Sequence, residues 1–135
     1  MITAVDTSVL IDVFRDDLEF GQRSAEALRE CLRTGSVVAC DIVWSELAAV
    51  FPSTRAFEKA METLSVEFQP VGQEAALLAG EMWRRYRQRG GNRSRVIPDF
   101  LIGAHAQRQC DRLLTRDRGF YRTYFSKLRV LDPSQ

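Results

Sequence analysis

MITAVDTSVLID, residues 1–12, is the stretch that decides the fold. Residues 2–5 form a short apolar run typical of a buried strand, and Asp6 follows it directly. Thr7 and Ser8 are residue types that begin helices, and the apolar side chains after them repeat at helical spacing: Val9, Leu10, Val13 and Phe14. Open α/β sheets place their chemistry where a strand ends and a helix follows. We therefore predict that Asp6 is one of several carboxylates that meet there and hold a divalent metal.

The rest of the chain alternates short apolar runs, typical of strands, with longer segments of helical periodicity. Further strands are predicted at 36–40, 66–69, 112–115 and 128–131. Helices are predicted at 19–34, 42–51, 54–64, 72–89 and 97–109, with a turn or short helix at 119–125. This alternation predicts a single α/β domain with a central parallel sheet of about five strands and helices on both of its faces.

Composition places the chain among ordinary globular proteins. Of its 135 residues, 45% are hydrophobic and 27% are charged. No run of about 18 apolar residues is present, so we expect no membrane-spanning segment. The three cysteines are far apart and form no C-x-x-C pair, which favours reduced thiols and a cytoplasmic location.

A net charge of +1 hides a strong asymmetry along the chain. Residues 1–81 carry 6 basic and 14 acidic side chains, whereas residues 82–135 carry 13 basic and 4 acidic ones. Arginine suits phosphate, and a basic excess at one end favours nucleic-acid binding. Genomic base composition, or a solvated basic helix end, is the alternative explanation. The candidate phosphate contacts are Arg85, Arg89, Arg93, Arg95, Arg116 and Arg118.

Four acids share one kind of position in the predicted fold. Asp6 and Asp117 follow strands, and Glu46 and Asp99 lie in the first turn or so of helices. In a parallel sheet such positions share one edge, so the four carboxylates can converge without strain. Each acid alone could instead cap a helix, close a turn or pair with an arginine. The four together favour a metal site.

An all-carboxylate set suits Mg²⁺ or Mn²⁺, and a single histidine excludes a histidine-rich centre. One or two such cations can activate a water for attack on a phosphodiester and stabilise the charge that develops there. The sequence contains no Ser-His-Asp or Cys-His constellation and no glycine-rich nucleotide loop. Metal-dependent hydrolysis is therefore the chemistry that the pattern favours.

At these residues the sequence resembles the PIN-domain ribonucleases, and among them the VapC-type toxins of bacterial toxin–antitoxin pairs. Four stretches carry the resemblance, in the order of the family: VDTSVLID (5–12), SEL (45–47), PDFLIGAHA (98–106) and LLTRD (113–117). Together they extend over nearly the whole chain. One departure is Arg118-Gly119 after the last acid, where many relatives carry Asn, His or Asp, and this leaves a second metal site open.

The resemblance implies a PIN fold and a Mg²⁺- or Mn²⁺-dependent endoribonuclease that cleaves RNA by metal-activated water. It assigns the catalytic and metal-binding roles to Asp6, Glu46, Asp99 and Asp117. Supporting hydroxyls near the metal would come from Thr7, Ser8 and Thr115. It also implies a homodimer that a cognate antitoxin protein silences. The identity of the RNA and of the antitoxin is not contained in the sequence.

Two other functions stay open at this point. A PIN-like module could bind RNA or a partner without cleaving it, and a metal-dependent phosphatase could use the same sheet edge. Three aspartates near the first helix, Asp12, Asp16 and Asp17, are expected to form a solvated helix end. His105 lies six positions after Asp99, about 240° around a helix, so we expect it to pack or face solvent rather than join the site.

Overall fold

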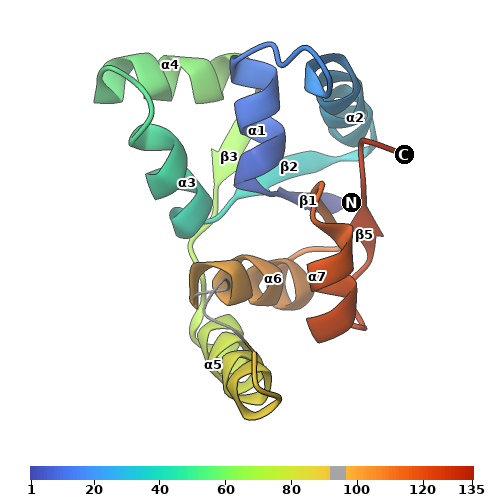
Figure 1. Cartoon of the computed structure of the whole chain (residues 1–135). Helices are drawn as coiled ribbons and strands as arrows, with labels where there is room; N and C mark the ends of the chain where they lie inside the picture. Colours follow the sequence, from blue (N-terminus) through green and yellow to red (C-terminus); the bar gives the residue numbers. More distant parts are fainter. Residues whose placement is uncertain (92–96) are drawn as a thin grey trace.

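A computed structural model describes residues 1–91 and 97–135 of the chain (Figure 1). Its five strands form one sheet in the order β3-β2-β1-β4-β5, and every neighbouring pair is parallel. The strands are β1 (Ile2–Val5), β2 (Ser36–Ala39), β3 (Val66–Phe68), β4 (Arg112–Leu114) and β5 (Val130–Leu131). The predicted parallel α/β sheet is therefore confirmed. Four predicted strands are too long: those predicted at 36–40, 66–69 and 112–115 each end one residue earlier, and the strand predicted at 128–131 begins at residue 130.

Seven helices lie within the described ranges and cover both faces of the sheet (Figure 1). They are α1 (Thr7–Phe14), α2 (Gly21–Thr34), α3 (Asp41–Ala48), α4 (Thr54–Thr63), α5 (Gln73–Gln88), α6 (Ile97–Gln109) and α7 (Arg118–Tyr124). The helices α1 and α2 pack together on one face, and α6 and α7 lie on the other, with α5 outside α6. None of the described helices is both long and apolar enough to cross a membrane.

The strand β1 lies at the centre of the sheet and is buried from Thr3 onward. Its start is fixed by the turn before β2, where the Ser36 amide donates to the Met1 carbonyl at 3.0 Å. A Cβ atom at Gly35 would lie 1.8 Å from that oxygen, so only glycine allows the two chains to approach this closely. Glycine here therefore both ends α2 and admits β1 to the middle of the sheet.

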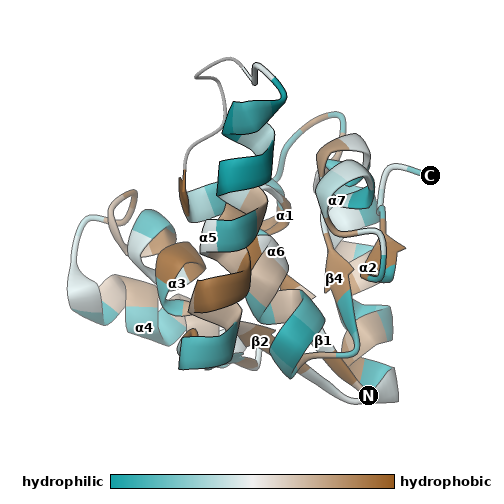
Figure 2. Ribbon diagram, turned by 90° about the horizontal axis from the view of Figure 1, so that it is seen from below, coloured by the Kyte–Doolittle hydropathy of each residue, from teal (hydrophilic) through white to brown (hydrophobic). Residues whose placement is uncertain are grey.

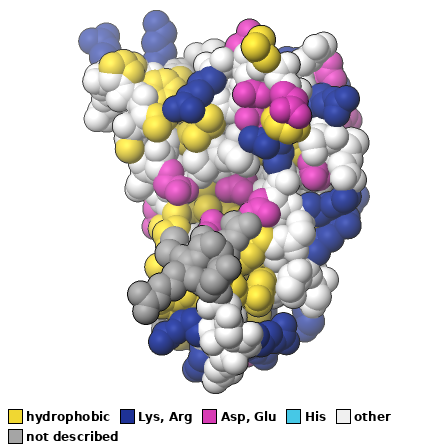
Figure 3. All heavy atoms as spheres, in the orientation of Figure 1, with side chains coloured by type: hydrophobic (Ala, Val, Ile, Leu, Met, Phe, Trp, Pro, Cys, Tyr) yellow, Lys and Arg dark blue, Asp and Glu magenta, His cyan; other side chains and the backbone are white. Residues whose placement is uncertain are grey.

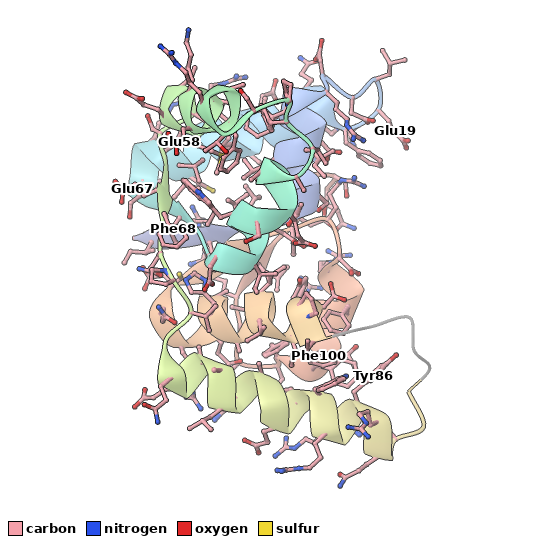
Figure 4. The ribbon with its side chains drawn as sticks, turned by 90° about the vertical axis from the view of Figure 1, so that its left-hand side faces the viewer. Glu19, Glu58, Glu67, Phe68, Tyr86 and Phe100 are labelled. Atoms are coloured by element: carbon pink, nitrogen blue, oxygen red, sulfur yellow. The ribbon has the colours of Figure 1, made fainter. Side chains whose placement is uncertain are left out.

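Aromatic rings fill the layer between α5, α6 and α7. Phe100 is fully buried, and its ring lies within 5.7 Å of the rings of Tyr86, Phe120 and Tyr124. Figure 4 shows Tyr86 on α5 beside Phe100 on α6. Gly103, one turn later, leaves the space that the Phe125 ring occupies. This packing holds the first turn of α6, and with it Asp99, in a fixed place against the sheet.

Hydrophobicity follows the same layers. Figure 2 shows hydrophobic residues along β4 and hydrophilic residues over much of α5. Between α3, α4 and β3, Trp44 contacts Phe57 and Phe68 edge-on, with ring centroids 5.2 Å apart in both pairs. Trp44 is half-buried and packs against the hydrophobic core. This second aromatic cluster packs α3, the helix that carries Glu46, against β3 at one edge of the sheet.

Candidate active site

The order of the strands shows where the chemistry of this sheet belongs. From β1 the chain first builds outward through β2 and β3, then returns to place β4 on the other side of β1. The carboxyl ends of β1 and β4 therefore flank a topological switch point, which is the usual ligand site of an open α/β sheet. Asp6 directly follows β1, and Thr115 directly follows β4. The sequence prediction that Asp6 stands at this edge is confirmed.

Asp6 is buried, with 8% of its surface exposed, and both carboxylate oxygens accept hydrogen bonds. Oδ1 accepts from the Thr7 amide at 2.8 Å and so caps α1, while Oδ2 accepts from the Thr115 hydroxyl at 2.7 Å. Burial raises the pKa of Asp6 from 3.8 to about 6, against the lowering effect of these two hydrogen bonds. The nearby charges of Asp99 and Glu46 raise that pKa further. Three of the four predicted acids therefore interact electrostatically.

The loop after β4 is joined to Asp6 through Thr115. The Thr115 hydroxyl donates to Asp6 and accepts from the Asp117 amide at 3.0 Å. Thr115 is fully buried, so this short chain of hydrogen bonds is shielded from water. It fixes the backbone of the fourth predicted acid, Asp117, relative to the first. The hydroxyl of Thr115 thus contacts a carboxylate, as the resemblance implies.

Glu46 lies farther along its helix than predicted. It is the sixth residue of α3, beyond the first turn, and its side chain is exposed. Its Oε1 accepts a hydrogen bond of 2.7 Å from the hydroxyl of Thr7. The helix begins at Asp41, one residue before the predicted start at 42, so Glu46 lies in its second turn. The Asp41 carboxylate accepts from the Val71 amide.

Asp99 lies in the first turn of α6, as predicted, and is half-buried. An acid there is stabilised by the positive end of the helix dipole. Figure 3 shows acidic side chains across the middle of one face of the molecule, with basic side chains mainly nearer its edges. At the sheet edge the charges of Asp99 and Glu46 act on Asp6 and raise its pKa, and a bound cation would offset this repulsion between like charges.

The chemistry of the donor set fits a hard divalent cation, since its side-chain atoms are carboxylate and hydroxyl oxygens. Within the described ranges, no three Asp, Glu, His or Cys side chains are close enough together to hold one ion. The hydroxyl of Ser8, two residues after Asp6, is buried, and over the part of the chain that is described it is the one such side-chain atom without a hydrogen-bond partner. An orphaned hydroxyl here is consistent with a site that binds a further polar group. Convergence of all four acids on one ion stays a prediction.

Asp12 was expected at a solvated helix end, and this prediction is wrong. Only 3% of Asp12 is exposed, because the residue lies on the inner side of α1. Arg116 donates to both of its carboxylate oxygens, at 2.7 and 3.0 Å, and the Ser24 hydroxyl donates at 3.0 Å. Asp16 and Asp17 are exposed, as expected. Two features of the sequence could have indicated this pair: Asp12 lies among apolar residues of a helix, and Arg116 directly precedes the predicted site acid Asp117.

The arginines predicted to contact phosphate lie in different surroundings. Arg116 is committed to Asp12, Arg85 pairs with Glu81 at 2.9 Å, and Arg118 donates to the Gln135 side chain. Arg89 is exposed at the end of α5. Arg93 and Arg95 lie outside the described residues. His105 is buried and its Nε2 lies 2.8 Å from Gln69 Oε1, so the prediction that it packs is confirmed.

A family comparison agrees with this architecture. The model of the PIN domain matches residues 3–126. The chain belongs to the PIN domain family. No curated protein matches it in sequence. The match to the PIN domain model covers all four predicted acids, from Asp6 to Asp117.

Solved structures have the same fold over nearly their full length. VapBC-1 from nontypeable Haemophilus influenzae is similar with a TM-score of 0.77 and 21% identity, covering 100% of both chains. VapBC2 from Rickettsia felis, bound to a DNA fragment from its promoter, is similar with a TM-score of 0.76 and 17% identity over 98% of each chain. FitAcB from Neisseria gonorrhoeae has a TM-score of 0.68 and 20% identity over 98% of each chain. At these identities the likeness establishes the fold of this PIN domain.

Proposed function

We propose that this PIN domain is a metal-dependent endoribonuclease and the toxin of a type II toxin–antitoxin pair. The observation that carries the proposal is Asp6: a buried carboxylate at the switch point of the sheet, whose pKa is raised to about 6 by burial and by two neighbouring acids. Keeping this carboxylate ionised in such a place costs free energy, which a bound cation would offset. The PIN family match supports nuclease chemistry at the same edge.

In this proposal Asp6, Asp99 and Glu46 would hold a Mg²⁺ or Mn²⁺ ion, and Asp117 would add a ligand directly or through water. The cation, when bound, supplies the positive charge that stabilises the phosphate oxygens and the leaving oxygen. The chain positions its own ligands: Thr115 holds Asp6, and Thr7 holds Glu46, each by a hydrogen bond of 2.7 Å. In hydrolysis the oxygen of water bonds to phosphorus, the bond between phosphorus and the 3′ oxygen breaks, and a proton from the water ends on that oxygen, leaving a 5′-phosphate and a 3′-hydroxyl.

Single-stranded RNA is the proposed substrate, and the basic second half of the chain is its proposed contact surface. Arg85, Arg89 and Arg118 lie at or near the protein surface with long, flexible side chains. Surface ion pairs such as Arg85–Glu81 are weak, about 0–1 kcal/mol, so a phosphate can compete for the arginine. Arg93 and Arg95 extend the same basic run in sequence. Contacts of this kind set affinity and its salt dependence rather than sequence preference.

The partners in this proposal follow from the similar structures. One of the similar structures is a toxin–antitoxin complex from Klebsiella pneumoniae, with a TM-score of 0.69 and 19% identity. By analogy we propose a cognate antitoxin for this chain, a homodimer as the functional unit, and a location in the cytoplasm. A small open reading frame next to the gene, and co-purification of its product, would test the antitoxin.

A binding module without cleavage is the second candidate, and one observation favours it. No three potential ligands are grouped for a metal within residues 1–91 and 97–135. Measurable RNA binding with intact RNA after incubation with Mn²⁺ would select this function. Release of phosphate from a small ester, again with intact RNA, would select the phosphatase instead.

The deciding experiment is cleavage of a 5′-labelled single-stranded RNA by the purified chain with Mn²⁺, Mg²⁺ or excess EDTA. We expect cleavage with either metal and none with EDTA. Asp99→Asn removes a proposed ligand and should reduce the rate at least about 100-fold. Asp16→Asn is the matched control, since Asp16 is exposed and its positive φ of 48° suits asparagine. Full activity of Asp99→Asn would overturn the assignment.

A further inference from the structure

We propose that Asp12 and Arg116, hereafter the Asp12–Arg116 pair, are positioning residues that hold the Thr115–Asp117 loop in its place beside Asp6. The inference rests on the proposed function, because it assigns the pair to the same site. It is an alternative to the sequence prediction that Arg116 contacts RNA. The pair joins two parts of the chain that are 104 positions apart in sequence.

The first support is the geometry of the pair. Arg116 Nε donates to Asp12 Oδ2 at 2.7 Å, and Arg116 Nη2 donates to Oδ1 at 3.0 Å. This is a bidentate contact, which fixes the plane of the guanidinium as well as its position. The same guanidinium stacks on Phe20, with its carbon 4.1 Å from the ring centroid. The guanidinium of Arg116 is therefore held at its edge by Asp12 and on its face by the Phe20 ring.

The second support is that the acceptor is itself fixed. Asp12 is 3% exposed, and its Oδ2 also accepts from the hydroxyl of Ser24, which is fully buried on α2. Phe20 is the N-cap residue of that helix. Because Asp12 is buried and accepts several hydrogen bonds, it is a fixed anchor for the Arg116 side chain. The loop is therefore attached to the packed pair of helices α1 and α2.

The third support is the position of Arg116 in the loop. Its neighbour Thr115 donates to Asp6, and its other neighbour Asp117 donates its amide back to Thr115. Asp6 caps α1, and Asp12 lies six residues later on the same helix, about 9 Å along its axis. Consecutive loop residues thus attach to the start and to the second turn of one helix. Two such attachments define both the position and the direction of the segment that delivers Asp117.

Arg116→Lys is the first test variant, because lysine keeps the charge but cannot make the bidentate contact. Arg33→Lys is the matched control, since Arg33 makes an exposed ion pair with Glu30 far from the site in sequence. The first readout is amide hydrogen exchange followed by NMR, which needs neither metal nor RNA. We expect exchange at Asp117 to become at least about 10-fold faster in Arg116→Lys. The Leu113 amide donates to the backbone carbonyl of Arg129, and its exchange should not change.

The second readout is steady-state cleavage of RNA. A positioning role predicts that Arg116→Lys lowers kcat at least about 10-fold with KM within about 2-fold of wild type. An RNA contact predicts the opposite, a raised KM with kcat unchanged, and would overturn the proposal. Unchanged exchange at Asp117 would overturn it as well.

Asp12→Asn is the second variant and covers the case in which Arg116→Lys does not fold. Asparagine keeps the shape of the side chain and one acceptor oxygen, and we expect the same pattern at reduced size. If the wild-type chain cleaves no RNA, the nuclease proposal fails. The exchange experiment then still decides whether the pair positions the loop.

Discussion

Replacement of Asp6 by asparagine should change how the unfolding free energy of the metal-free protein depends on pH. The pKa of Asp6 is about 6 in the folded protein and 3.8 in its ordinary state, which the unfolded chain approximates. Between these values the folded state holds a proton that the unfolded state has lost. Stability therefore falls as pH rises from about 4 to about 6, because the unfolded state binds fewer protons there.

The size of this loss follows from the shift. A change from 3.8 to about 6 is roughly 2 pK units, and each unit corresponds to about 1.4 kcal/mol. The charged form of Asp6 thus makes the folded state less stable at neutral pH by about 3 kcal/mol. Asparagine has no charge to bury and still caps α1 by accepting from the Thr7 amide. The unfolding free energy of Asp6→Asn minus that of wild type should increase by about 3 kcal/mol from about pH 4 to about pH 7.

Urea unfolding in EDTA at several pH values measures this difference directly. Groups that titrate in both proteins cancel in the subtraction, so the remaining pH dependence belongs to Asp6 and to acids coupled with it. Asp16→Asn, at an exposed position just beyond α1, is the matched control. A difference that stays flat, or that decreases with pH, would refute the argument that Asp6 is buried beside other acids.

Three further predictions concern the same end of the sheet. Mn²⁺ at about 100 times its Kd should stabilise the wild type by about 2.7 kcal/mol at neutral pH but not Asp6→Asn, measured by thermal unfolding; an equal gain in both would place the ion elsewhere. Ser8→Ala should raise the unfolding free energy of the metal-free protein by about 1 kcal/mol, because it removes a buried hydroxyl without a partner; a loss in urea unfolding would mean that the hydroxyl is satisfied. Gly35→Ala should cost at least about 2 kcal/mol in the same assay, since its Cβ would meet the Met1 carbonyl, and wild-type stability would contradict that contact.

Much of the fold could be predicted because its signals are local. A four-residue apolar run followed by Asp6 and two helix-starting residues is enough to predict a strand, a turn and a helix. Alternation along the chain then predicts the parallel sheet. The sheet edge that collects Asp6, Asp99 and the loop of Asp117 follows from topology, because strand ends and helix starts of a parallel sheet share one side.

What could not be predicted depends on contacts between distant parts of the chain. Asp12 looks like a surface residue in a helical pattern, and only its pairing with Arg116 makes its burial possible. Arg112 is similar: a strand residue with 8% exposure whose guanidinium donates to the hydroxyls of Thr3 and Thr34. Periodicity records which positions face inward on average, but it does not record which charged side chain finds a partner there.

Fold and site are coupled most closely at Asp6, because one carboxylate does two things. It caps α1 through Oδ1 and receives the Thr115 hydroxyl through Oδ2, so removal of the side chain also removes a helix cap that contributes about 1 kcal/mol. Alanine at this position would confuse loss of chemistry with loss of structure. Asparagine separates them, since it keeps the cap and removes only the charge. Loss of metal binding or cleavage in a more stable Asp6→Asn protein would therefore assign the charge, and not the shape of the residue, to function.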